Sequence, residues 1–259
     1  MNADPTAKQD ALLELGKSFE QQLAAVKARR ADVNWYPYGS IANIGILSRF
    51  LPAALLDRLQ QGNGSSALDV GAADGDVAYF LESRGWKVDV IDNPPTNFNQ
   101  CKALEAMKSE LSSAVRIDHL DIDRPFELSR QYDLVVALGI LYHLRNPFAF
   151  LMSLALHSER MLLSTRIARE TKQGLDYAAV PAAYLLAARE CNDDPTNFWI
   201  FTPIGLERLL TRCGWRVVAK MEAGTTVHSN PVDPDKDERH FVYCERVPNW
   251  RGLKVHSDF

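Results

Sequence analysis

Residues 67–76 read ALDVGAADGD, and this stretch decides the fold. Its first four residues are mostly apolar and predict a short buried strand. The next residues are small enough for a tight turn, and apolar residues at helical spacing then run from Val77 to a stop at Gly85. Strand, tight turn and helix in this order build the ligand site of open α/β sheets, because backbone N–H groups and the positive end of the helix dipole meet there.

Asp92 closes the next apolar run, about 20 residues after Gly71, where an acidic side chain can accept hydrogen bonds from both hydroxyls of a ribose. The dinucleotide pattern GxGxxG does not fit, because it would place Ala73 and Asp76 at its second and third glycines. The pattern acid-x-Gly-x-Gly-x-Gly, starting at Asp69, fits better, with Ala73 in place of its middle glycine. The methyl group of that alanine is tolerated if its φ is negative, which we expect here.

The rest of the chain alternates strand patterns with helical patterns. This alternation predicts a doubly wound, Rossmann-like α/β fold with a parallel sheet of seven strands. An insertion at 168–202, with a helix expected at 182–189, leaves the carboxyl end of the fifth strand, and a long loop at 224–239 reaches the same ligand face. The later strands are expected at 115–119, 133–138, 161–165, 215–219 and 241–245, and the later helices at 97–113, 147–157 and 203–213.

We expect two parts of the chain, an N-terminal helical cap or lid over 1–60 and a core over 61–259. The cap begins with an amphipathic helix at about 7–31, whose apolar stripe packs on its own domain, against a dimer partner or as a lid. Ser40 is expected to cap the next helix. Residues 34–40, NWYPYGS, carry three aromatic side chains, which either line a small-molecule pocket or simply pack.

The composition disfavours several classes of protein. A net charge of −4 and a pI of about 5.9 give no overall basic field for nucleic acid, although a local basic patch is still allowed. The four cysteines are far apart and the six histidines show no HExxH spacing, so we expect reduced thiols and no metal site. No signal-peptide pattern and no apolar run of roughly 18 residues is found, which favours a cytoplasmic protein without a membrane partner.

Four segments resemble class I S-adenosylmethionine (AdoMet)-dependent methyltransferases: the turn at 69–75, Asp92, residues 121–123 and residues 132–144. Within that superfamily, residues 138–147, LGILYHLRNP, are most similar to the wobble-uridine tRNA carboxymethyltransferase group. That group has a basic, tryptophan-rich segment before the core, used for a carboxylated cofactor, whereas residues 34–38 here are aromatic but not basic.

The resemblance implies that AdoMet is the cofactor. The glycine turn would hold its methionine part and Asp92 its ribose, while Asp121 or Asp123 would accept a hydrogen bond from the adenine amine, unless both are solvated loop acids. Tyr142 would reach toward the methionine part or the substrate. The cofactor-binding residues implied in this way are Asp69, Gly71, Ala73, Asp74, Gly75, Asp92, Asn93, Asp121, Ile122, Asp123, Leu138, Gly139 and Tyr142.

The catalytic candidates are Tyr142 and His143, which both follow the fourth strand. His143 is the best candidate for a general base, because it follows the strand on the cofactor side and imidazole titrates near neutral pH. The alternative is that it caps the next helix or packs at the edge of the sheet. The candidate substrate-binding residues are Tyr36, Tyr38, Tyr177, Asn197, Trp199 and His228. His228 is also a second candidate for the general base.

The predicted function is methyl transfer from AdoMet to an oxygen or nitrogen atom of a small molecule or glycan. One alternative is a methyl or carboxymethyl transferase acting on tRNA wobble uridine, and another is a non-catalytic AdoMet-binding module. The tRNA alternative predicts a basic stripe beside the site, formed by Arg145, Arg166, Arg169 and Lys172. A homodimer through the N-terminal helix is a further expectation.

Overall fold

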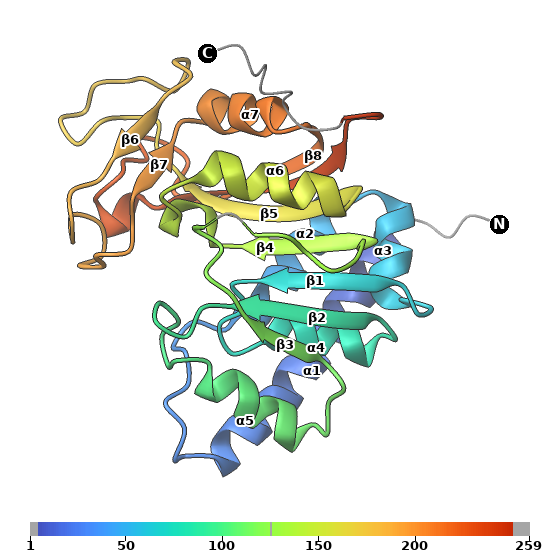
Figure 1. The fold of residues 1–259 in the computed structure, drawn as a ribbon. Helices are drawn as coiled ribbons and strands as arrows, with labels where there is room; N and C mark the ends of the chain where they lie inside the picture. Colours follow the sequence, from blue (N-terminus) through green and yellow to red (C-terminus); the bar gives the residue numbers. More distant parts are fainter. Residues whose placement is uncertain (1–4, 125, 251–259) are drawn as a thin grey trace.

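The computed structural model describes residues 5–124 and 126–250 (Figure 1). Seven strands form the main sheet in the order β3-β2-β1-β4-β5-β9-β8, and two short strands, β6 and β7, extend it beyond the end of β4. The strands are β1 (Ser66–Val70), β2 (Lys87–Asp92), β3 (Arg116–His119), β4 (Leu134–Leu138), β5 (Arg160–Ile167), β6 (Ala183–Leu185), β7 (Trp199–Phe201), β8 (Trp215–Gly224) and β9 (Glu238–Arg246).

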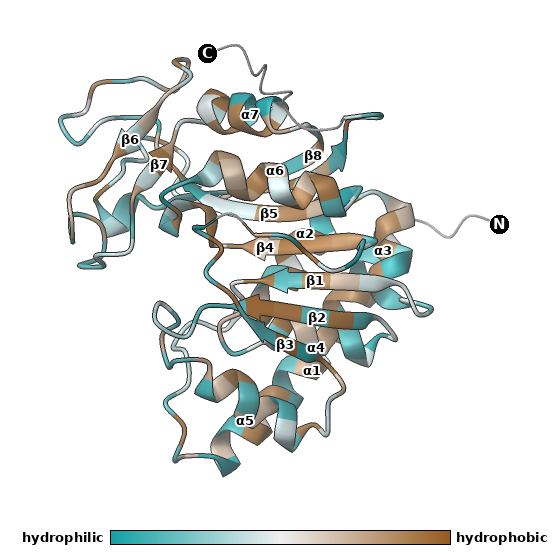
Figure 2. Ribbon diagram, in the orientation of Figure 1, coloured by the Kyte–Doolittle hydropathy of each residue, from teal (hydrophilic) through white to brown (hydrophobic). Residues whose placement is uncertain are grey.

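The strands β1 to β5 are parallel, and β9 runs antiparallel between β5 and β8. The predicted Rossmann-like sheet is therefore confirmed, with two differences: its last strand reverses direction, and β6 and β7 extend it. The inner strand β4 is buried on both faces, as its unbroken apolar sequence requires. Figure 2 shows most of β2 and β4 in brown, the colour of hydrophobic residues.

Helices cover both faces of the sheet (Figure 1). The helices α1 to α5 share one apolar core on the first face, and α6 and α7 share the core on the opposite face. The helices are α1 (Pro5–Arg29), α2 (Asn43–Phe50), α3 (Ala53–Gln60), α4 (Asp76–Ser83), α5 (Lys102–Glu110), α6 (Pro147–His157) and α7 (Pro203–Arg212), with 3-10 turns η1 (Ser40–Ala42), η2 (Leu141–His143) and η3 (Pro234–Lys236).

The N-terminal helix α1 buries the predicted apolar stripe within its own chain. Leu12, Phe19, Leu23 and Val26 lie in the core of the first face, where α1 contacts α2, α3 and α4. Burial of such side chains stabilises the fold by about 1.5–3 kcal/mol each. The helix therefore packs on its own domain, and the division into a cap over 1–60 and a core over 61–259 stays a prediction.

Two local predictions in the first half of the chain are wrong. Ser40 does not cap α2, because it begins η1 and the chain passes through that turn directly into the helix at Asn43. The helix expected at 97–113 is only α5, because Gln100 and Cys101 have φ of 61° and 64°. Two successive left-handed residues cannot continue a right-handed helix, so the chain makes turns before Lys102.

The insertion at 168–202 follows β5 as predicted, but its expected helix at 182–189 is wrong. Ala183–Leu185 form β6, which pairs antiparallel with β7. β5 continues past the end of β4, and its last residue, Ile167, pairs with Phe201 of β7. This free edge organises residues 183–185 as a strand, so tertiary pairing overrides local helix propensity.

The last two strands are longer than predicted. β8 runs to Gly224 and β9 starts at Glu238, so the loop between them covers only residues 225–237. β9 begins beside the carboxyl end of β5, where Arg239 pairs with Arg166. This register brings the long loop to the ligand face of the sheet. No helix in the described ranges is long and apolar enough to cross a membrane.

Candidate functional site

The glycine turn after β1 has the geometry that its sequence requires. Gly71 and Gly75 have φ of 69° and 84°, and Gly75 leads directly into α4. A Cβ at Gly71 would lie 2.8 Å from Cδ1 of Ile140, so a side chain here would have to displace Ile140 as well as adopt a strained φ. Ala73 has a φ of 54°, which corrects the expectation of a negative φ there. The turn holds this alanine in the left-handed region at an energetic cost.

Two buried acids stand beside the turn. Burial, together with the nearby charge of Asp92, raises the pKa of Asp69 to about 7. Asp92, at the end of β2, accepts hydrogen bonds at Oδ2 from Ala73 N–H and Asn97 Nδ2, and at Oδ1 from the N–H of Asn93. Because each carboxylate oxygen can accept two hydrogen bonds, Oδ1 has one acceptor site left for a ligand. Asp92 and the turn are thus brought together as predicted.

Asp74, which the resemblance places among the cofactor-binding residues, has protein partners in this structure, and its contact with the cofactor stays a prediction. Its carboxylate accepts hydrogen bonds from the N–H of Tyr36 at 2.9 Å and from Asn99 Nδ2 at 2.8 Å. Nζ of Lys27 lies 3.2 Å from Asp74 and 3.1 Å from Asp76, and both acids are only 2% exposed. The end of α1 and the aromatic segment 34–40 are therefore fastened to the glycine turn.

Tyr36 extends from this anchor across the ligand face. Its ring makes edge-to-face contacts with Tyr38 and with Phe98, which follows β2. Burial raises the pKa of Tyr36, and the charges of Tyr142 and Arg239 also act on its phenol. Tyr38 and Phe98 are 72% and 52% exposed, so they form an aromatic rim rather than part of the core.

The acids after β3 are engaged with neighbouring loops. Asp123 accepts hydrogen bonds from the N–H and Nε of Arg145, both at 2.7 Å, and from the N–H of Asn146. Asp121 accepts a hydrogen bond from the N–H of Asp123 and pairs with Arg124. Ile122 is buried in the core with α6. The segment thus joins the β3 and β4 loops, and its contact with adenine stays a prediction.

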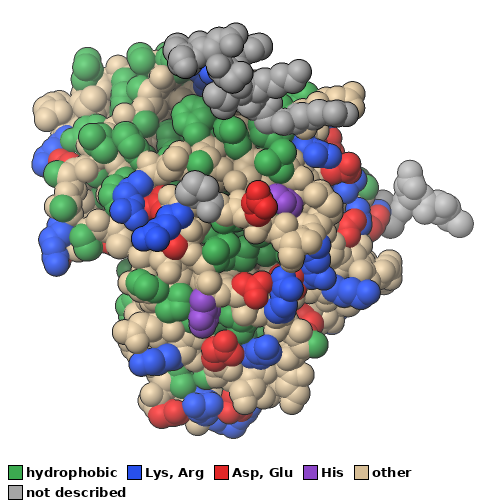
Figure 3. Space-filling model, viewed as in Figure 1, with side chains coloured by type: hydrophobic (Ala, Val, Ile, Leu, Met, Phe, Trp, Pro, Cys, Tyr) green, Lys and Arg blue, Asp and Glu red, His purple; other side chains and the backbone are tan. Residues whose placement is uncertain are grey.

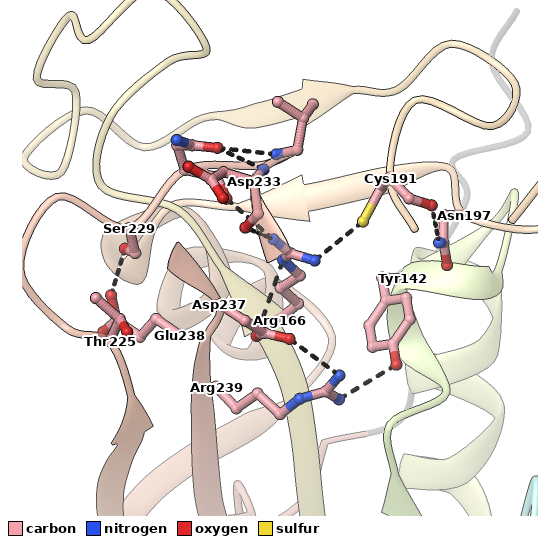
Figure 4. Close-up of polar contacts among 12 residues, drawn as sticks. Tyr142, Arg166, Cys191, Asn197, Thr225, Ser229, Asp233, Asp237, Glu238 and Arg239 are labelled. Carbon is pink, nitrogen blue, oxygen red and sulfur yellow. Dashed lines mark hydrogen bonds and ion pairs between the residues drawn. The ribbon is translucent and has the colours of Figure 1, made fainter. Parts of the chain in front are cut away.

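Tyr142, after β4, and Arg239, at the start of β9, face one another (Figure 4). Nη1 of Arg239 donates a hydrogen bond to Oη of Tyr142 at 3.2 Å, and Nη2 lies 3.4 Å from Oδ2 of Asp237. Gly139 lies directly beside them, since a Cβ there would be 3.7 Å from Oη of Tyr142 and 3.9 Å from Nη1 of Arg239. Leu138, the last residue of β4, packs against the core of the first face.

Arg166 joins the insertion to the long loop behind this pair (Figure 4). It is 1% exposed, and it donates hydrogen bonds to Sγ of Cys191 and to the carbonyl oxygens of Asn230 and Asp233. Its Nε lies 3.9 Å from Oδ1 of Asp237, the same carboxylate that contacts the guanidinium described above. These contacts offset part of the cost of burying the charge, and Nε has no hydrogen-bond partner in the described structure.

The insertion supplies polar groups near the same place. Asn197 is buried and donates from Nδ2 to the carbonyl oxygen of Cys191, while its Oδ1 has no hydrogen-bond partner in the described structure. The hydroxyl of Tyr177 and Nε1 of Trp199 are also buried without a partner there. Unpaired buried groups are costly, so these atoms are available to hydrogen-bond with water or a ligand. Their contact with a substrate stays a prediction.

The two histidine candidates have different surroundings. Nδ1 of His143 lies 2.9 Å from Oγ1 of Thr196, so its imidazole is tied to the insertion beside the ligand face. Burial lowers the pKa of His143. His228 lies on the long loop, where it is exposed and pairs with Glu170 of the insertion.

A second group of titratable residues lies under the long loop. Carboxylate and imidazole atoms of Glu222, Glu238 and His240 lie within 4.8 Å of one another. Arg169 already pairs with Glu238 at 2.7 Å and with Glu222 at 2.9 Å. Burial would raise the pKa of Glu238, but hydrogen bonds from His240, Arg169 and Ser229 lower it to about 2. This group is therefore an ion-pair network that fastens the loop to β8 and β9.

Lys27, Phe98 and Arg239 are among the site residues that were not predicted from the sequence. Lys27 falls on the polar side of an amphipathic helix, where lysine is usually solvated. Arg239 follows a run of charged residues that the sequence assigns to the loop. A signal was present there, since Arg239, Phe241 and Tyr243 alternate with the period of a strand.

These residues fit a cationic nucleoside such as AdoMet. Asp69, Asp74, Asp76 and Asp92 are all buried beside the turn, and among the described ion pairs only Lys27 neutralises any of them. An excess of carboxylates suits a ligand with a positive sulfonium centre. Gly139 and the free acceptor site on Asp92 lie at the carboxyl ends of β4 and β2, on either side of β1, at the edge where open α/β sheets bind ligands.

Comparison with known families decides the class. A methyltransferase domain family matches residues 44–220, which is most of the chain. The chain belongs to this methyltransferase family. The predicted identity as a class I AdoMet-dependent methyltransferase is confirmed, and AdoMet is its cofactor.

One curated relative matches this methyltransferase over part of its length. The ubiquinone biosynthesis O-methyltransferase of Rickettsia typhi is 28% identical over 123 residues. The match covers 46% of the present chain and 47% of that protein, so it spans about half of each.

Solved structures of methyltransferases share the fold. A putative methyltransferase from Bacillus halodurans has a TM-score of 0.55 at 15% identity, over 75% of this chain and 98% of that one. The N-terminal domain of EvdMO1 with S-adenosylhomocysteine bound has a TM-score of 0.54 at 17% identity, over 88% and 96% of the two chains. The same domain was also solved with S-adenosylhomocysteine and D-fucose, with a TM-score of 0.53 at 18% identity, over 75% and 81%.

Proposed function

We propose that this methyltransferase methylates an oxygen or nitrogen atom of a small molecule or glycan. The proposal rests on one observation: the four basic residues that would form a stripe for tRNA are either paired with acids or buried. Arg145 pairs with Asp123, Arg169 with two glutamates, and Lys172 with Glu190. Arg166 is buried, so none of the four offers a free cation to phosphates.

The charge on the viewed surface agrees with this proposal. Figure 3 shows Lys and Arg side chains interspersed with Asp and Glu rather than gathered in a single basic field. The relatives add support of the same kind. One is named for O-methylation in ubiquinone biosynthesis, and the EvdMO1 domain was crystallised with a sugar. Both point to a small acceptor.

We propose that the turn at 69–75, Asp92 and Asn93 bind the methionine and ribose parts of AdoMet, with residues 121–123 near its adenine. AdoMet supplies an electrophilic methyl group on its sulfonium sulfur. The chain must place the acceptor atom in line with that methyl group, and such positioning can lower the barrier by about 7–11 kcal/mol. Gly139 and Tyr142 stand at the end of β4, beside the place we assign to the methionine part.

The acceptor would lie on the β5 and β9 side of Tyr142, between Arg239 and the insertion. Tyr36 and Tyr38 approach from the N-terminal segment, and Asn197 approaches from the insertion. Flat aromatic rings next to hydrogen-bonding groups suit a sugar or an aromatic ring. Tyr177 and Trp199 complete the candidate wall, whereas His228 lies exposed beside Glu170 and is the weakest candidate.

A methyl-transfer assay with radiolabelled AdoMet tests the proposal. The purified enzyme would be given separate pools of hydroxylated sugars, phenols and amines, and in parallel total tRNA. We expect label in a small-molecule pool and none in tRNA above a no-enzyme control. Label transferred to tRNA, with none in any small-molecule pool, would overturn the proposed acceptor class. Saturable binding of S-adenosylhomocysteine without transfer to any pool would favour the non-catalytic alternative.

A further inference from the structure

The imidazole of His143 is held from one side by a single residue of the insertion. Nδ1 lies 2.9 Å from Oγ1 of Thr196 and 3.3 Å from the carbonyl oxygen of the same residue. The two residues are 53 positions apart in the chain, so the folded insertion creates this contact. It joins the turn after β4 to the segment that precedes β7.

Thr196 is itself fixed by an acid. Its hydroxyl donates a hydrogen bond of 2.6 Å to Oδ1 of Asp194, and its backbone N–H donates one of 2.8 Å to the same atom. A carboxylate oxygen accepts hydrogen bonds and cannot donate one, so it takes the single proton of the hydroxyl. Oγ1 then has only lone pairs to offer toward His143.

The proton on the imidazole follows from these two contacts. Both atoms that face Nδ1, the threonine Oγ1 and the carbonyl oxygen, act as acceptors, so Nδ1 must carry the proton. In a neutral imidazole the other nitrogen, Nε2, is then unprotonated. The contacts therefore select the tautomer in which Nε2 can accept a proton.

The surroundings keep this imidazole neutral and close to the proposed acceptor. Its ring centre lies 4.3 Å from that of Tyr142. The charged groups that act on it are Asp194, which raises its pKa, and Arg239, which lowers it. Burial is the largest effect and lowers the pKa of His143, so the ring is uncharged at neutral pH.

We propose that Thr196 and Asp194 are positioning residues that hold His143 as the Nδ1-protonated tautomer, so that Nε2 takes the proton from a hydroxyl acceptor as it is methylated. The inference rests on the proposed function and narrows it to O-methylation, because a neutral amine needs no base to react. The proton leaves the acceptor oxygen, makes His143 an imidazolium, and passes to water before the next turnover.

Nitrogen-15 NMR of the histidine side chains tests the tautomer without any acceptor. The full-length enzyme is used with S-adenosylhomocysteine bound, and His143→Gln assigns the resonances. We expect the wild type at pH 7.5 to show a protonated Nδ1 and a bare Nε2. Thr196→Val, which removes the hydroxyl but keeps the shape, should give a mixture of both tautomers. Thr196→Ser should restore the wild-type spectrum.

Kinetics with a hydroxylated acceptor from the labelling assay provide the second readout. Thr196→Val should lower kcat about 10–100-fold, which is the scale of general-base catalysis, with an unchanged Kd for S-adenosylhomocysteine. Thr196→Ser should stay within about threefold of the wild type. Asp194→Asn changes the carboxylate that fixes Thr196, and Asp193→Asn is its matched control. The carboxylate of Asp193 is exposed and pairs only with Arg189 among the described contacts.

A wild-type spectrum with the proton on Nε2 would overturn the inference, and so would a Thr196→Val spectrum identical to that of the wild type. These results come from the enzyme without acceptor, so they are independent of whether the acceptor class is correct. Failure to label any small molecule, with the expected spectra, would overturn the proposed function instead.

Discussion

Nη1 of Arg239 donates a hydrogen bond of 3.2 Å to the hydroxyl of Tyr142, and the guanidinium lies 5.6 Å from the centre of that ring. The contact joins the turn after β4 to the start of β9. It fixes the direction of the phenol beside Gly139, at the boundary between the proposed cofactor and acceptor sites. Substitution of either residue should therefore change the kinetics with the acceptor rather than the binding of the cofactor.

Arg239→Gln is expected to lower kcat/KM for the acceptor by about 10–100-fold, because the hydroxyl of Tyr142 loses the group that orients it. The Kd of S-adenosylhomocysteine should stay within about twofold of the wild type. Steady-state kinetics and calorimetric titration measure the two quantities. Arg216→Gln, an exposed arginine on β8, serves as the control. An equal loss in both measurements would show that Arg239 acts on the cofactor side.

Lys27→Met should weaken binding of S-adenosylhomocysteine by about tenfold, because Asp74 and Asp76 lose the cation that neutralises them beside the turn. The segment 34–40, held by Asp74 through the N–H of Tyr36, should also exchange its amide hydrogens faster. Titration calorimetry and hydrogen-exchange mass spectrometry measure these effects. Lys17→Met, on the exposed side of the same helix, should change neither quantity.

Ala73→Gly should stabilise the protein by about 1 kcal/mol, because the alanine is held at a φ of 54° where glycine has no steric cost. Ala72→Gly is the matched control in the same turn. It loses a buried methyl group without relieving a left-handed residue, so it should destabilise by about 1 kcal/mol. Urea unfolding measures both. Destabilisation by Ala73→Gly would show that the turn is not strained at this residue.

Arg166→Met should destabilise the fold by about 3 kcal/mol, because two carbonyl oxygens and the carboxylate of Asp237 lose their buried partner. Urea unfolding monitored by circular dichroism measures the change. Arg208→Met, on α7, is the comparison outside this network. A loss below about 1 kcal/mol would show that the guanidinium contributes little beyond its own desolvation.

The buried carboxyl of Asp69 gives a pH-dependent contribution to stability. Burial raises its folded pKa from 3.8 to about 7, so between these pH values the folded state holds a proton that the unfolded state has released. The stabilisation is fully present below pH 3.8 and is lost as the pH rises to about 7. Asp69→Asn should therefore lose less stability than the wild type between pH 5 and pH 7.5.

Denaturant titrations at those two pH values, without cofactor, make the comparison. Glu127→Gln removes an exposed carboxyl group and is the control. If the free energy of unfolding changes equally with pH in Asp69→Asn and in the wild type, the pH dependence does not come from Asp69.

The sequence predicted most of the sheet, because its central strands are continuous apolar runs bounded by turn residues. The turn at 69–75 and Asp92 were found for the same reason, since local patterns place both at the ends of neighbouring strands. β6 was missed because residues 183–185 have no strand pattern of their own and become a strand only by pairing with β7. Such pairing depends on where the rest of the chain places a free edge.

The acceptor side of the site was harder to predict. Its polar groups, Arg166, Asp237 and Arg239, are far apart in the sequence from Tyr142 and Asn197, and their charges resemble ordinary surface residues. Only the antiparallel register of β9 against β5 brings them together. The role of Lys27 could not be predicted for the same reason. Its partners, Asp74 and Asp76, lie 47 and 49 residues further along the chain.

A crystal structure with S-adenosylhomocysteine bound tests the central claim most directly. We expect its ribose to contact Asp92, its sulfur to lie beside Gly139, and the space beyond the sulfur to be enclosed by Tyr142, Arg239 and the insertion. A sulfur that faces an open surface lined by unpaired lysine and arginine side chains would contradict the account.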